Sequence, residues 1–509
     1  MNLAAFAQRR FAGSAIALVA GIALALSFAP IDLWPLAFVA PAVLMWLWQD
    51  TTPRRAAVHG FWFNAGTFAV GTYWLYIAIA EIGHAPLPLT FFLMIGMISI
   101  MSAYHALLGW FVAKYLPAHG ALRWIVGIPG AWLFTEWWRS WFLTGFGWLA
   151  LGYSQTDTWL AGLAPVVGQF GIGLAVLLVA GALLTLLLGS RRERIVAGSV
   201  VVAIAGASFA LHGRSWTNPS GPPVSTVIVQ GAIPQDEKWI DENLDKTLEV
   251  YRDLSRQAHG AKIIVWPESA IPDLANNHIE FYKQVYQEAS AEGSSLVMGT
   301  MRMEENPKTG ESEFFNSVLA MDRASPGVGW YDKHHLVPFT EFVPLPDFAR
   351  EWLRLCNLPS ESFTRGAAVQ EPFEAGGQKI AASVCYEDAY GSTQLPALRT
   401  ATLLVNVTND AWFGHSTARY QHLQISRMRA IEAGRPMVRA ANTGVSAIIE
   451  SDGRIVATAA EYAPAVVIAD VQPRIGLTPY AWTGNSLIVV QALVLAAASA
   501  YFRRVRKTA

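Results

Sequence analysis

The sequence is poor in charged residues and in cysteine. Only 15% of its 509 residues are charged, against about 25% in an ordinary soluble domain, while 53% are hydrophobic. This composition excludes a disordered chain and a single soluble globule. The formal net charge of −1 also excludes a nucleic-acid binder that works through bulk positive charge. The two cysteines are Cys356 and Cys385.

The few charges are unevenly distributed along the chain. Residues 1–218 hold 11 basic and 6 acidic residues, residues 219–480 hold 22 and 32, and residues 481–509 hold 4 and none. The near-neutral total therefore conceals a hydrophobic part with net charge +9 and a polar part with net charge −10. This division predicts a membrane protein that carries one large water-facing domain.

Eight apolar runs approach or exceed the about 17–25 residues that a membrane-crossing helix needs. They are Phe11–Phe28, Leu33–Trp48, Gly60–Ala80, Leu89–Val112, Trp124–Phe142, Leu160–Leu188, Ile195–Leu211 and Trp482–Tyr501. We expect a helical membrane bundle of seven spans in residues 1–217, and an eighth span with a basic tail in residues 481–509. The second run is the weakest, because Pro35 and Pro41 interrupt it. The first run also resembles a signal peptide, but we expect it to be retained because a second apolar run follows closely.

Basic residues in the connections fall on one side of these alternating runs. They are Arg9, Arg10, Arg54, Arg55, Lys114, Arg123, Arg191, Arg192, Arg194, Arg503, Arg504, Arg506 and Lys507. The opposite connections, around Asp32 and in residues 81–88 and 143–159, contain no lysine or arginine. Because cytoplasmic loops are enriched in lysine and arginine, we expect both termini in the cytoplasm and residues 212–481 on the opposite side of the membrane.

Two ionisable residues lie inside the fifth run. Glu136 and Arg139 are three positions apart on one helix face, next to several tryptophans. One interpretation is a mutual ion pair near the outer interface, within an aromatic belt. The alternative is that this end of the bundle shapes an entrance for lipid.

Residues 218–480 alternate short β-rich runs with helical stretches. The expected strands are Ser225–Gln230, Lys262–Trp266, Ser295–Met301, Asn316–Met321, Lys379–Cys385, Thr402–Asn406 and Ser446–Glu450. The expected helices are Glu242–Gln257, Ile279–Ala291 and Arg419–Ala433. Continuous apolar runs such as Ile263–Trp266 indicate strands buried on both faces, so the pattern predicts an α/β sandwich.

Three strand ends in this domain carry reactive side chains. Glu268 follows the run that ends at Trp266, Lys333 precedes a proline-punctuated loop, and Cys385 closes another strand. Ligand sites of α/β proteins gather at the carboxyl ends of strands. A thiol nucleophile needs a base, and it needs a positive group near the oxyanion that forms. Glutamate, lysine and cysteine fit these three roles.

Each of these residues also has a plainer interpretation. A single strand cysteine is usually a small buried hydrophobe, and a disulfide between Cys356 and Cys385 would consume the nucleophile. Glu268 could cap a helix, and Lys333 could be exposed. We expect no metal and no cofactor, because the histidines lack a recognisable zinc spacing.

The motifs around these residues resemble those of the nitrilase superfamily. They are Trp266-Pro267-Glu268-Ser269, Lys333 with Leu336-Val337-Pro338-Phe339-Thr340-Glu341-Phe342-Val343-Pro344, Val384-Cys385-Tyr386-Glu387, Asn406-Val407-Thr408-Asn409-Asp410-Ala411-Trp412-Phe413-Gly414, Arg435-Pro436 and Asn442-Thr443-Gly444. Together with the expected bundle, they make nearly the full chain similar to the bacterial apolipoprotein N-acyltransferases, the membrane-embedded branch of that superfamily.

The resemblance implies a Glu-Lys-Cys triad on an α-β-β-α sandwich and a two-step acyl transfer. Glu268 would act as base on Cys385, whose thiolate would attack the sn-1 ester of a phospholipid, typically phosphatidylethanolamine. Lys333 would stabilise the oxyanion. The α-amine of the S-diacylglyceryl-cysteine of an apolipoprotein would then take the acyl chain from the thioester. The resemblance further implies a monomeric enzyme of the bacterial inner membrane with no nucleic-acid partner.

Other positions match the family with less defined roles. The resemblance implies that Glu341 supports the site, and that site structure or substrate binding involves Tyr386, Glu387, Asn316, Trp239, Trp412 and Glu432. Glu387 and Glu432 could instead bind backbone amides as scaffold. The bulky apolar residues of Pro344–Leu358 indicate either core packing or a flap over the site that touches lipid.

Two further classes of function remain open. A membrane-tethered nitrilase-like amidase, with water as the acceptor, would use the same triad. A receptor or binding module would leave the three triad positions far apart.

Overall fold

The computed structural model describes residues 10–508, apart from residues 259, 326 and 343–362. Cys356 and the whole Pro344–Leu358 segment therefore lie outside the described residues. The chain divides into two compact units. Unit 1 contains Met1–Arg214, Phe413–Gln424 and Pro479–Ala509, and unit 2 contains Ser215–Trp412 and Ile425–Thr478.

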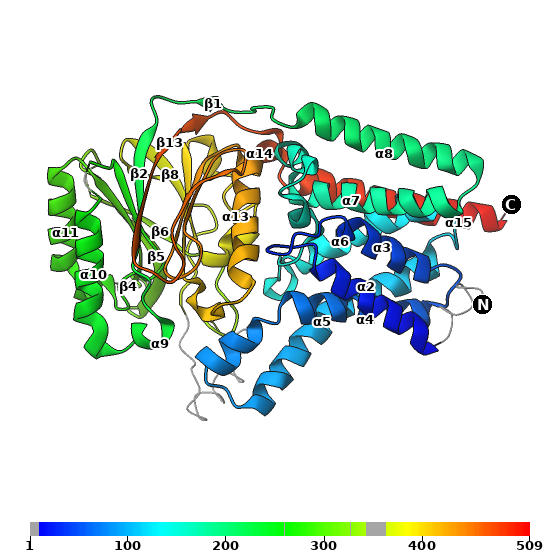
Figure 1. Ribbon diagram of the computed structural model, residues 1–509, viewed down its shortest axis with the longest axis horizontal. Helices are drawn as coiled ribbons and strands as arrows, with labels where there is room; N and C mark the ends of the chain where they lie inside the picture. The colour runs from blue at the N-terminus through cyan, green and yellow to red at the C-terminus, as the bar shows by residue number, and fades with distance from the viewer. Residues whose placement is uncertain (1–9, 259, 326, 343–362, 509) are drawn as a thin grey trace. The chain divides into compact units, whose positions relative to one another are not determined.

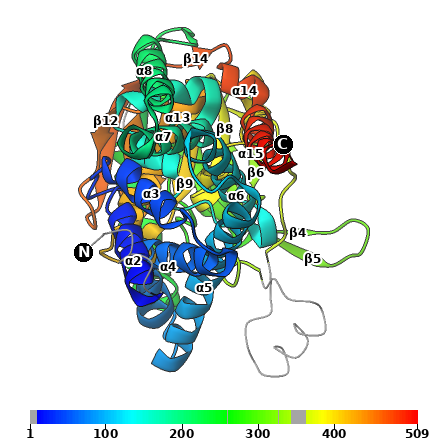
Figure 2. The ribbon, with the colours of Figure 1, turned by 90° about the vertical axis from the view of Figure 1, so that its right-hand side faces the viewer.

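Unit 1 is helical (Figures 1 and 2). Its main helices are α2 (Arg10–Ala25), α3 (Leu36–Leu47), α4 (Pro53–Gly71), α5 (Leu87–Tyr115), α6 (Ile128–Arg139), α7 (Ala164–Leu188), α8 (Arg191–Leu211), α14 (Pro479–Thr483) and α15 (Ser486–Thr508). Four helical stretches among the described residues are long and apolar enough to cross a membrane. These are Leu87–Tyr115, Trp159–Leu188, Arg191–Leu211 and Ser486–Val505.

Each of the eight apolar runs overlaps a helix, but several helices are shorter than the runs. Helix α3 has 12 residues and contains Pro41, which interrupts the backbone hydrogen-bond ladder. Helix α6 also has 12 residues and ends at Arg139, where the chain continues as short 3₁₀ turns and irregular segments. Four candidate spans are thus found, and the count of eight stays a prediction.

Glu136 and Arg139 form the ion pair that their spacing indicates. The Arg139 Nη2 and Glu136 Oε1 atoms are 3.9 Å apart, and both side chains are buried. Arg139 also donates to the carbonyls of Phe146 and Trp148, at 2.7 and 2.9 Å, and the Leu151 N–H donates to Glu136 at 2.6 Å. The pair therefore satisfies backbone groups of a buried segment that is not α-helical, where water is excluded.

Unit 1 also contains a segment that is remote from its helices in sequence, Phe413–Gln424. The Gln421 side-chain oxygen accepts hydrogen bonds from the indoles of Trp74 and Trp148, at 3.2 and 2.9 Å. The Phe413 and Trp74 rings contact edge to face, with centroids 4.6 Å apart. Aromatic and buried polar contacts thus join this segment to the helical unit.

Unit 2 is built on two six-stranded sheets. The first has the order β13-β2-β3-β4-β5-β6, with bounds Ala465–Val471, Val224–Gln230, Ile263–Trp266, Ser295–Glu305, Ser312–Met321 and Val328–Asp332. The second has the order β12-β11-β10-β9-β8-β7, with bounds Ile455–Thr458, Ala447–Ile449, Met437–Ala441, Leu403–Thr408, Gln378–Val384 and Phe373–Ala375. One apolar cluster takes residues from both sheets, so the sheets pack face to face.

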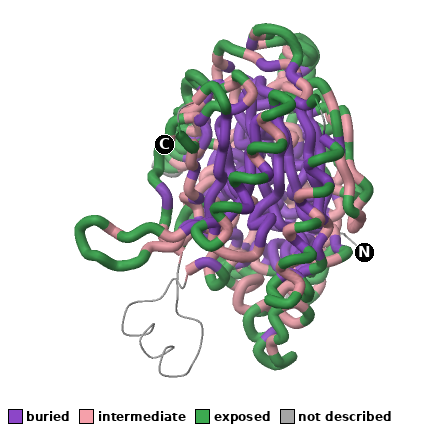
Figure 3. The backbone as a smooth tube through the Cα atoms, turned by 90° about the vertical axis from the view of Figure 1, so that its left-hand side faces the viewer, coloured by how far each residue is buried: buried purple, intermediate pink, exposed green. Residues whose placement is uncertain are grey.

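Helices cover this pair of sheets. A second cluster joins the other face of the first sheet to α10 (Leu244–Arg256) and α11 (Ile279–Ala291), and Figure 3 shows buried strands behind exposed helix backbone. Helix α13 (Ala418–Ala433) lies beside the second sheet (Figure 1). The predicted α-β-β-α sandwich is therefore found. Within the two six-stranded sheets, the sequence analysis missed five strands: β6, β7, β10, β12 and β13.

Candidate active site

The site is assembled where strands from both sheets end. Strand β3 ends at Trp266, two residues before Glu268, and β6 ends at Asp332, next to Lys333. Strand β8, from the other sheet, ends at Val384, next to Cys385. Because β3 and β8 lie in parallel regions of their sheets, loops at their carboxyl ends can meet.

Glu268 is buried, and both of its carboxylate oxygens have partners. Its Oε1 atom accepts from the Asn316 amide at 2.8 Å and from the Lys333 ammonium at 3.4 Å. Its Oε2 atom accepts from the backbone N–H of Asn409 at 2.8 Å. One residue within β5 and two residues that follow β6 and β9 thus fix the orientation of this carboxylate.

Lys333 lies between two carboxylates. Its ammonium donates to Glu341 Oε1 at 2.8 Å, and Asn316 bridges the same Glu341 oxygen and Glu268 Oε1 with its own amide group. Burial alone would lower the pKa of Lys333, but the carboxylates of Glu341 and Glu268 outweigh it and raise this pKa above its ordinary value. Lys333 is therefore a fixed cation at neutral pH.

Cys385 begins the 3₁₀ turn that follows β8, and its φ of 55° lies in the left-handed region. A non-glycine residue pays about 1–2 kcal/mol for this conformation, which is typical of residues held for function. The Asn406 amide donates to the Cys385 carbonyl at 3.0 Å and so holds the turn. The left-handed backbone conformation and the Asn406 hydrogen bond together fix the position of Cys385 at the end of β8.

The thiol of Cys385 is electrostatically coupled to the other two residues. Burial raises the pKa of Cys385 well above its ordinary value, the charge of Glu268 raises it further, and Lys333 lowers it. The Cys385 thiol is therefore uncharged at neutral pH, and a base would be needed to turn it into a thiolate. Both Glu268 and Lys333 act on this thiol through their charges.

Glu387 joins the loop of Lys333 to the turn of Cys385. Its Oε1 atom accepts from the backbone N–H groups of His334 and His335, at 2.8 and 2.9 Å. Its Oε2 atom accepts from the Val384 N–H at 2.8 Å and from the Tyr331 hydroxyl at 3.0 Å. The interpretation of Glu387 as a residue that binds backbone amides agrees with these contacts.

We expect Glu387→Gln to slow acyl transfer while the protein stays folded. Burial raises the pKa of Glu387 and its backbone hydrogen bonds oppose this, so the carboxylate depends on its N–H donors. Glutamine keeps the shape but turns one acceptor into a donor that faces N–H groups, at a cost of about 1–3 kcal/mol. A ~10-fold or greater fall in turnover, with a lower melting temperature, would support this positioning role. Full activity would contradict it. Glu374→Gln, on exposed β7 surface, is the matched control.

The remaining predicted residues differ in their contacts and in how far they are buried. Tyr386 donates to the Leu336 carbonyl at 3.2 Å, and its ring centroid is 6.0 Å from Lys333 Nζ. Glu432 is buried and pairs with Arg429 at 2.7 Å. Trp239 is 46% exposed, and Trp412 is partly exposed in a 3₁₀ turn. Glu268, Lys333, Cys385, Glu341 and Asn316 form the centre.

Three contacts of the centre come from residues to which the sequence analysis gave no role. Asn409 contributes its backbone N–H to Glu268. The Thr408 hydroxyl interacts with the Cys385 thiol. Lys238 donates to the Glu268 carbonyl at 3.3 Å. Asn409 and Thr408 stand in a quoted motif, but contacts of this kind depend on strand pairing and cannot be read from spacing.

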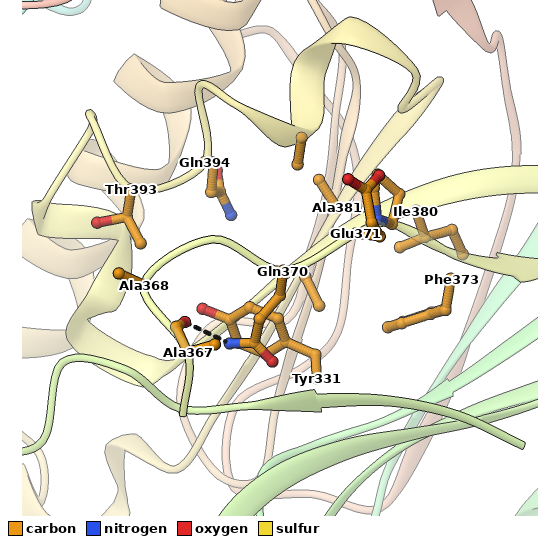
Figure 4. A pocket seen from close by; sticks show the side chains of 13 residues that line it. Tyr331, Ala367, Ala368, Gln370, Glu371, Phe373, Ile380, Ala381, Thr393 and Gln394 are labelled. Carbon is orange, nitrogen blue, oxygen red and sulfur yellow. Dashed lines mark hydrogen bonds between the residues drawn. The ribbon is translucent and has the colours of Figure 1, made fainter. Parts of the chain in front are cut away.

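Tyr331, whose hydroxyl donates to Glu387, also lines a small cavity (Figure 4). Its volume is about 20 Å³, and its lining includes Gln370, Phe373 and Ile380. This is room for about one water molecule. The cavity therefore offers no space for an acyl chain.

Comparisons with known proteins identify the family to which the chain belongs. An apolipoprotein N-acyltransferase of Methylococcus capsulatus is 38% identical over 473 residues, which cover 92% of each chain. Those of Azotobacter vinelandii and Photobacterium profundum are 38% and 36% identical and cover 94% and 92% of this chain, and 93% and 91% of their own length. The chain belongs to the apolipoprotein N-acyltransferase family.

Both parts of this apolipoprotein N-acyltransferase family member match known domain families. The apolipoprotein N-acyltransferase N-terminal domain matches residues 20–182, and the carbon-nitrogen hydrolase family matches residues 227–480. The first match falls in unit 1, and most of the second falls in unit 2. Glu268, Lys333 and Cys385 all lie within the carbon-nitrogen hydrolase match.

Proposed function

We propose that this protein transfers the sn-1 acyl chain of a phospholipid to the N-terminal α-amine of S-diacylglyceryl-cysteine on apolipoproteins. The observation that carries the chemistry is the Glu268–Lys333 contact of 3.4 Å, together with the electrostatic coupling of both residues to the Cys385 thiol. Full-length similarity to named apolipoprotein N-acyltransferases supports the acceptor. Phosphatidylethanolamine is the proposed donor, and the proposed enzyme acts as a monomer without a cofactor.

The first half-reaction acylates the enzyme. Glu268 takes the proton of the Cys385 thiol, and the thiolate attacks the ester carbonyl, forming a C–S bond. The oxyanion of the tetrahedral intermediate is stabilised by the fixed cation of Lys333. The C–O bond of the ester then breaks, the proton on Glu268 passes to the leaving oxygen, and lysophospholipid departs. A thioester remains on Cys385.

The second half-reaction regenerates the enzyme. The uncharged α-amine of the acceptor attacks the thioester carbonyl, and Glu268 takes a proton from the attacking nitrogen. The C–S bond breaks, the sulfur of Cys385 recovers a proton from Glu268, and the product carries a new amide bond. Separate donor and acceptor steps on one nucleophile predict ping-pong kinetics.

Buried contacts indicate which residues support these steps. Glu341 and Asn316 hold Lys333 and Glu268 together, and Glu387 joins the lysine loop to the cysteine turn. Tyr386 packs beside Lys333. Trp239 and Trp412 present partly exposed aromatic surface for substrate, and the Arg429–Glu432 pair is scaffold.

We further propose an inner-membrane enzyme with eight spans, both termini in the cytoplasm and the catalytic domain in the periplasm. The asymmetric distribution of lysine and arginine supports this orientation. Four helical stretches of spanning length among the described residues, and connections without lysine or arginine on one side of the runs, support a multi-pass arrangement. Both proposed substrates are membrane lipids, so a site held at the membrane surface can reach them.

An acceptor assay distinguishes acyl transfer from hydrolysis. Purified protein in detergent is incubated with phosphatidylethanolamine and a diacylglyceryl-cysteine peptide, and the mass of the peptide is measured by mass spectrometry. We expect one added acyl chain on the peptide amine and one lysophospholipid per amide formed. Free fatty acid with an unmodified peptide would instead support an amidase-like hydrolase that uses water.

A further inference from the structure

Lys238 is a buried lysine beside the active centre. It is the last residue of the short helix α9 (Gln235–Lys238), and only 1% of its surface is exposed. Its ammonium donates to the backbone carbonyl of Glu268 at 3.3 Å. Lysines are almost never fully buried unless they are paired, so a lysine in this position needs a reason.

Burial and a nearby negative charge act on the Lys238 ammonium in opposite directions. Burial lowers the pKa of Lys238 to about 8, and the negative charge of Glu268 opposes that fall. Trp239 lies beside it, with the ammonium 5.9 Å from the ring centroid. Lys238 therefore interacts with Glu268 in two ways, by a hydrogen bond to its backbone carbonyl and by charge with its carboxylate.

The segment that carries Lys238 is attached to the same loops that hold Glu268. Gln235 accepts from the Asn409 side chain at 2.9 Å, and the backbone N–H of that same asparagine donates to Glu268 Oε2. The Ile233 N–H donates to Asn442 at 3.0 Å. Helix α9 therefore contacts Glu268 directly through Lys238 and indirectly through Gln235.

The turn that bears Glu268 needs such support. Ser269, the next residue, has a φ of 45°, a left-handed conformation that a non-glycine residue adopts at a cost. A strained turn persists where its surroundings hold it in place. The Lys238 hydrogen bond to the Glu268 carbonyl acts on the peptide that immediately precedes Ser269.

We propose that Lys238 is a positioning residue for the catalytic base, holding the Glu268 turn in place and favouring the ionised form of its carboxylate through its positive charge. This inference rests on the proposed function, since it assigns Glu268 the role of base. Lys238 keeps its proton throughout and forms no bond with substrate. It is distinct from Lys333, which contacts the carboxylate itself.

Several groups face Glu268 and set the pH dependence together. They are Lys238 from α9, Asn316 from β5, Lys333 after β6, Glu341 from the following loop, Cys385 after β8 and Asn409 after β9. Removal of one of the two positive charges makes the ionised form of the Glu268 carboxylate less stable. The base would then be lost to protonation at a higher pH. The acid limb of the acylation rate should then move to higher pH.

The test measures the single-turnover rate of Cys385 acylation across the acid to neutral range in the full-length protein. We expect Lys238→Met to slow it about 10- to 100-fold, the usual effect of losing one hydrogen bond to a charged group, and to shift the acid limb upward. Lys238→Gln keeps a donor without the charge and should show the same shift with a smaller loss. Lys238→Arg should restore the position of the limb, and Lys246→Met, on exposed α10 surface, should match the wild type.

The outcomes separate this inference from the proposed function. A Lys238→Gln or Lys238→Met protein that matches the wild type in rate and pH profile overturns the inference. So does a slower variant whose acid limb has not moved, since that marks a purely structural role. A wild-type protein that is never acylated on Cys385 overturns the proposed function instead.

Discussion

Cys385→Ala should abolish acyl transfer altogether. The variant lacks the sulfur that carries the acyl chain, and loss of a nucleophile in other acyl-transfer enzymes lowers turnover by about 10⁵–10⁶-fold. Cys385→Ser should be nearly as inactive, because a hydroxyl is a far weaker nucleophile than the thiolate in a site arranged for sulfur. The measurement is the rate of peptide N-acylation with phospholipid as donor.

The fold should survive this change. Cys385 is partly exposed, and alanine removes only its sulfur atom. Melting temperatures within a few degrees of the wild type would show that the loss is chemical. Turnover by Cys385→Ala above about 1% of wild type would mean that another group carries the acyl chain or that none does.

Lys333→Met is the second change with a large expected effect. The fixed cation stabilises the oxyanion, and loss of one such group costs about 10²–10³-fold in turnover. The variant also leaves the buried carboxylates of Glu268 and Glu341 without their shared counter-charge, which should destabilise the fold by about 3–5 kcal/mol. Both turnover and the free energy of unfolding should therefore fall.

A double variant separates these two effects. Lys333→Met with Glu341→Gln removes one of the two carboxylates together with the cation, so we expect it to recover part of the lost stability but none of the activity. Activity that returns with stability would contradict the oxyanion role. In the wild type, the raised pKa of Lys333 means that its stabilising charge is present at neutral pH and is lost only under strongly alkaline conditions.

Buried strands and strand-end residues were predictable from sequence because they obey local rules. The continuous apolar run Ile263–Trp266 indicated a strand buried on both faces, and it is β3 between two parallel neighbours. Glu268 and Cys385 closely follow such strands, so a place at the carboxyl end of a strand was predictable for each of them. The expected strand at Asn316–Met321 begins earlier, at Ser312, since its polar start forms a hairpin with β4.

Other contacts were not predictable, because they depend on how distant segments meet. Gln421 is a polar residue on an expected helix, and nothing in its neighbourhood indicates that two tryptophans of unit 1 donate to it. Lys238 stands in a charged stretch that is typical of a solvated surface, yet it is buried. Four candidate spans are found among the described residues, so the predicted number of eight stays a prediction.

The covalent acyl-enzyme is the central claim, and one measurement tests it most directly. The wild-type protein is incubated with phospholipid labelled in its sn-1 chain, without acceptor, and digested for mass spectrometry. We expect the labelled acyl mass on the peptide that contains Cys385, removable by neutral hydroxylamine and passed to the amine when diacylglyceryl-cysteine peptide is added. An unmodified Cys385 in protein that still N-acylates the peptide would contradict the mechanism.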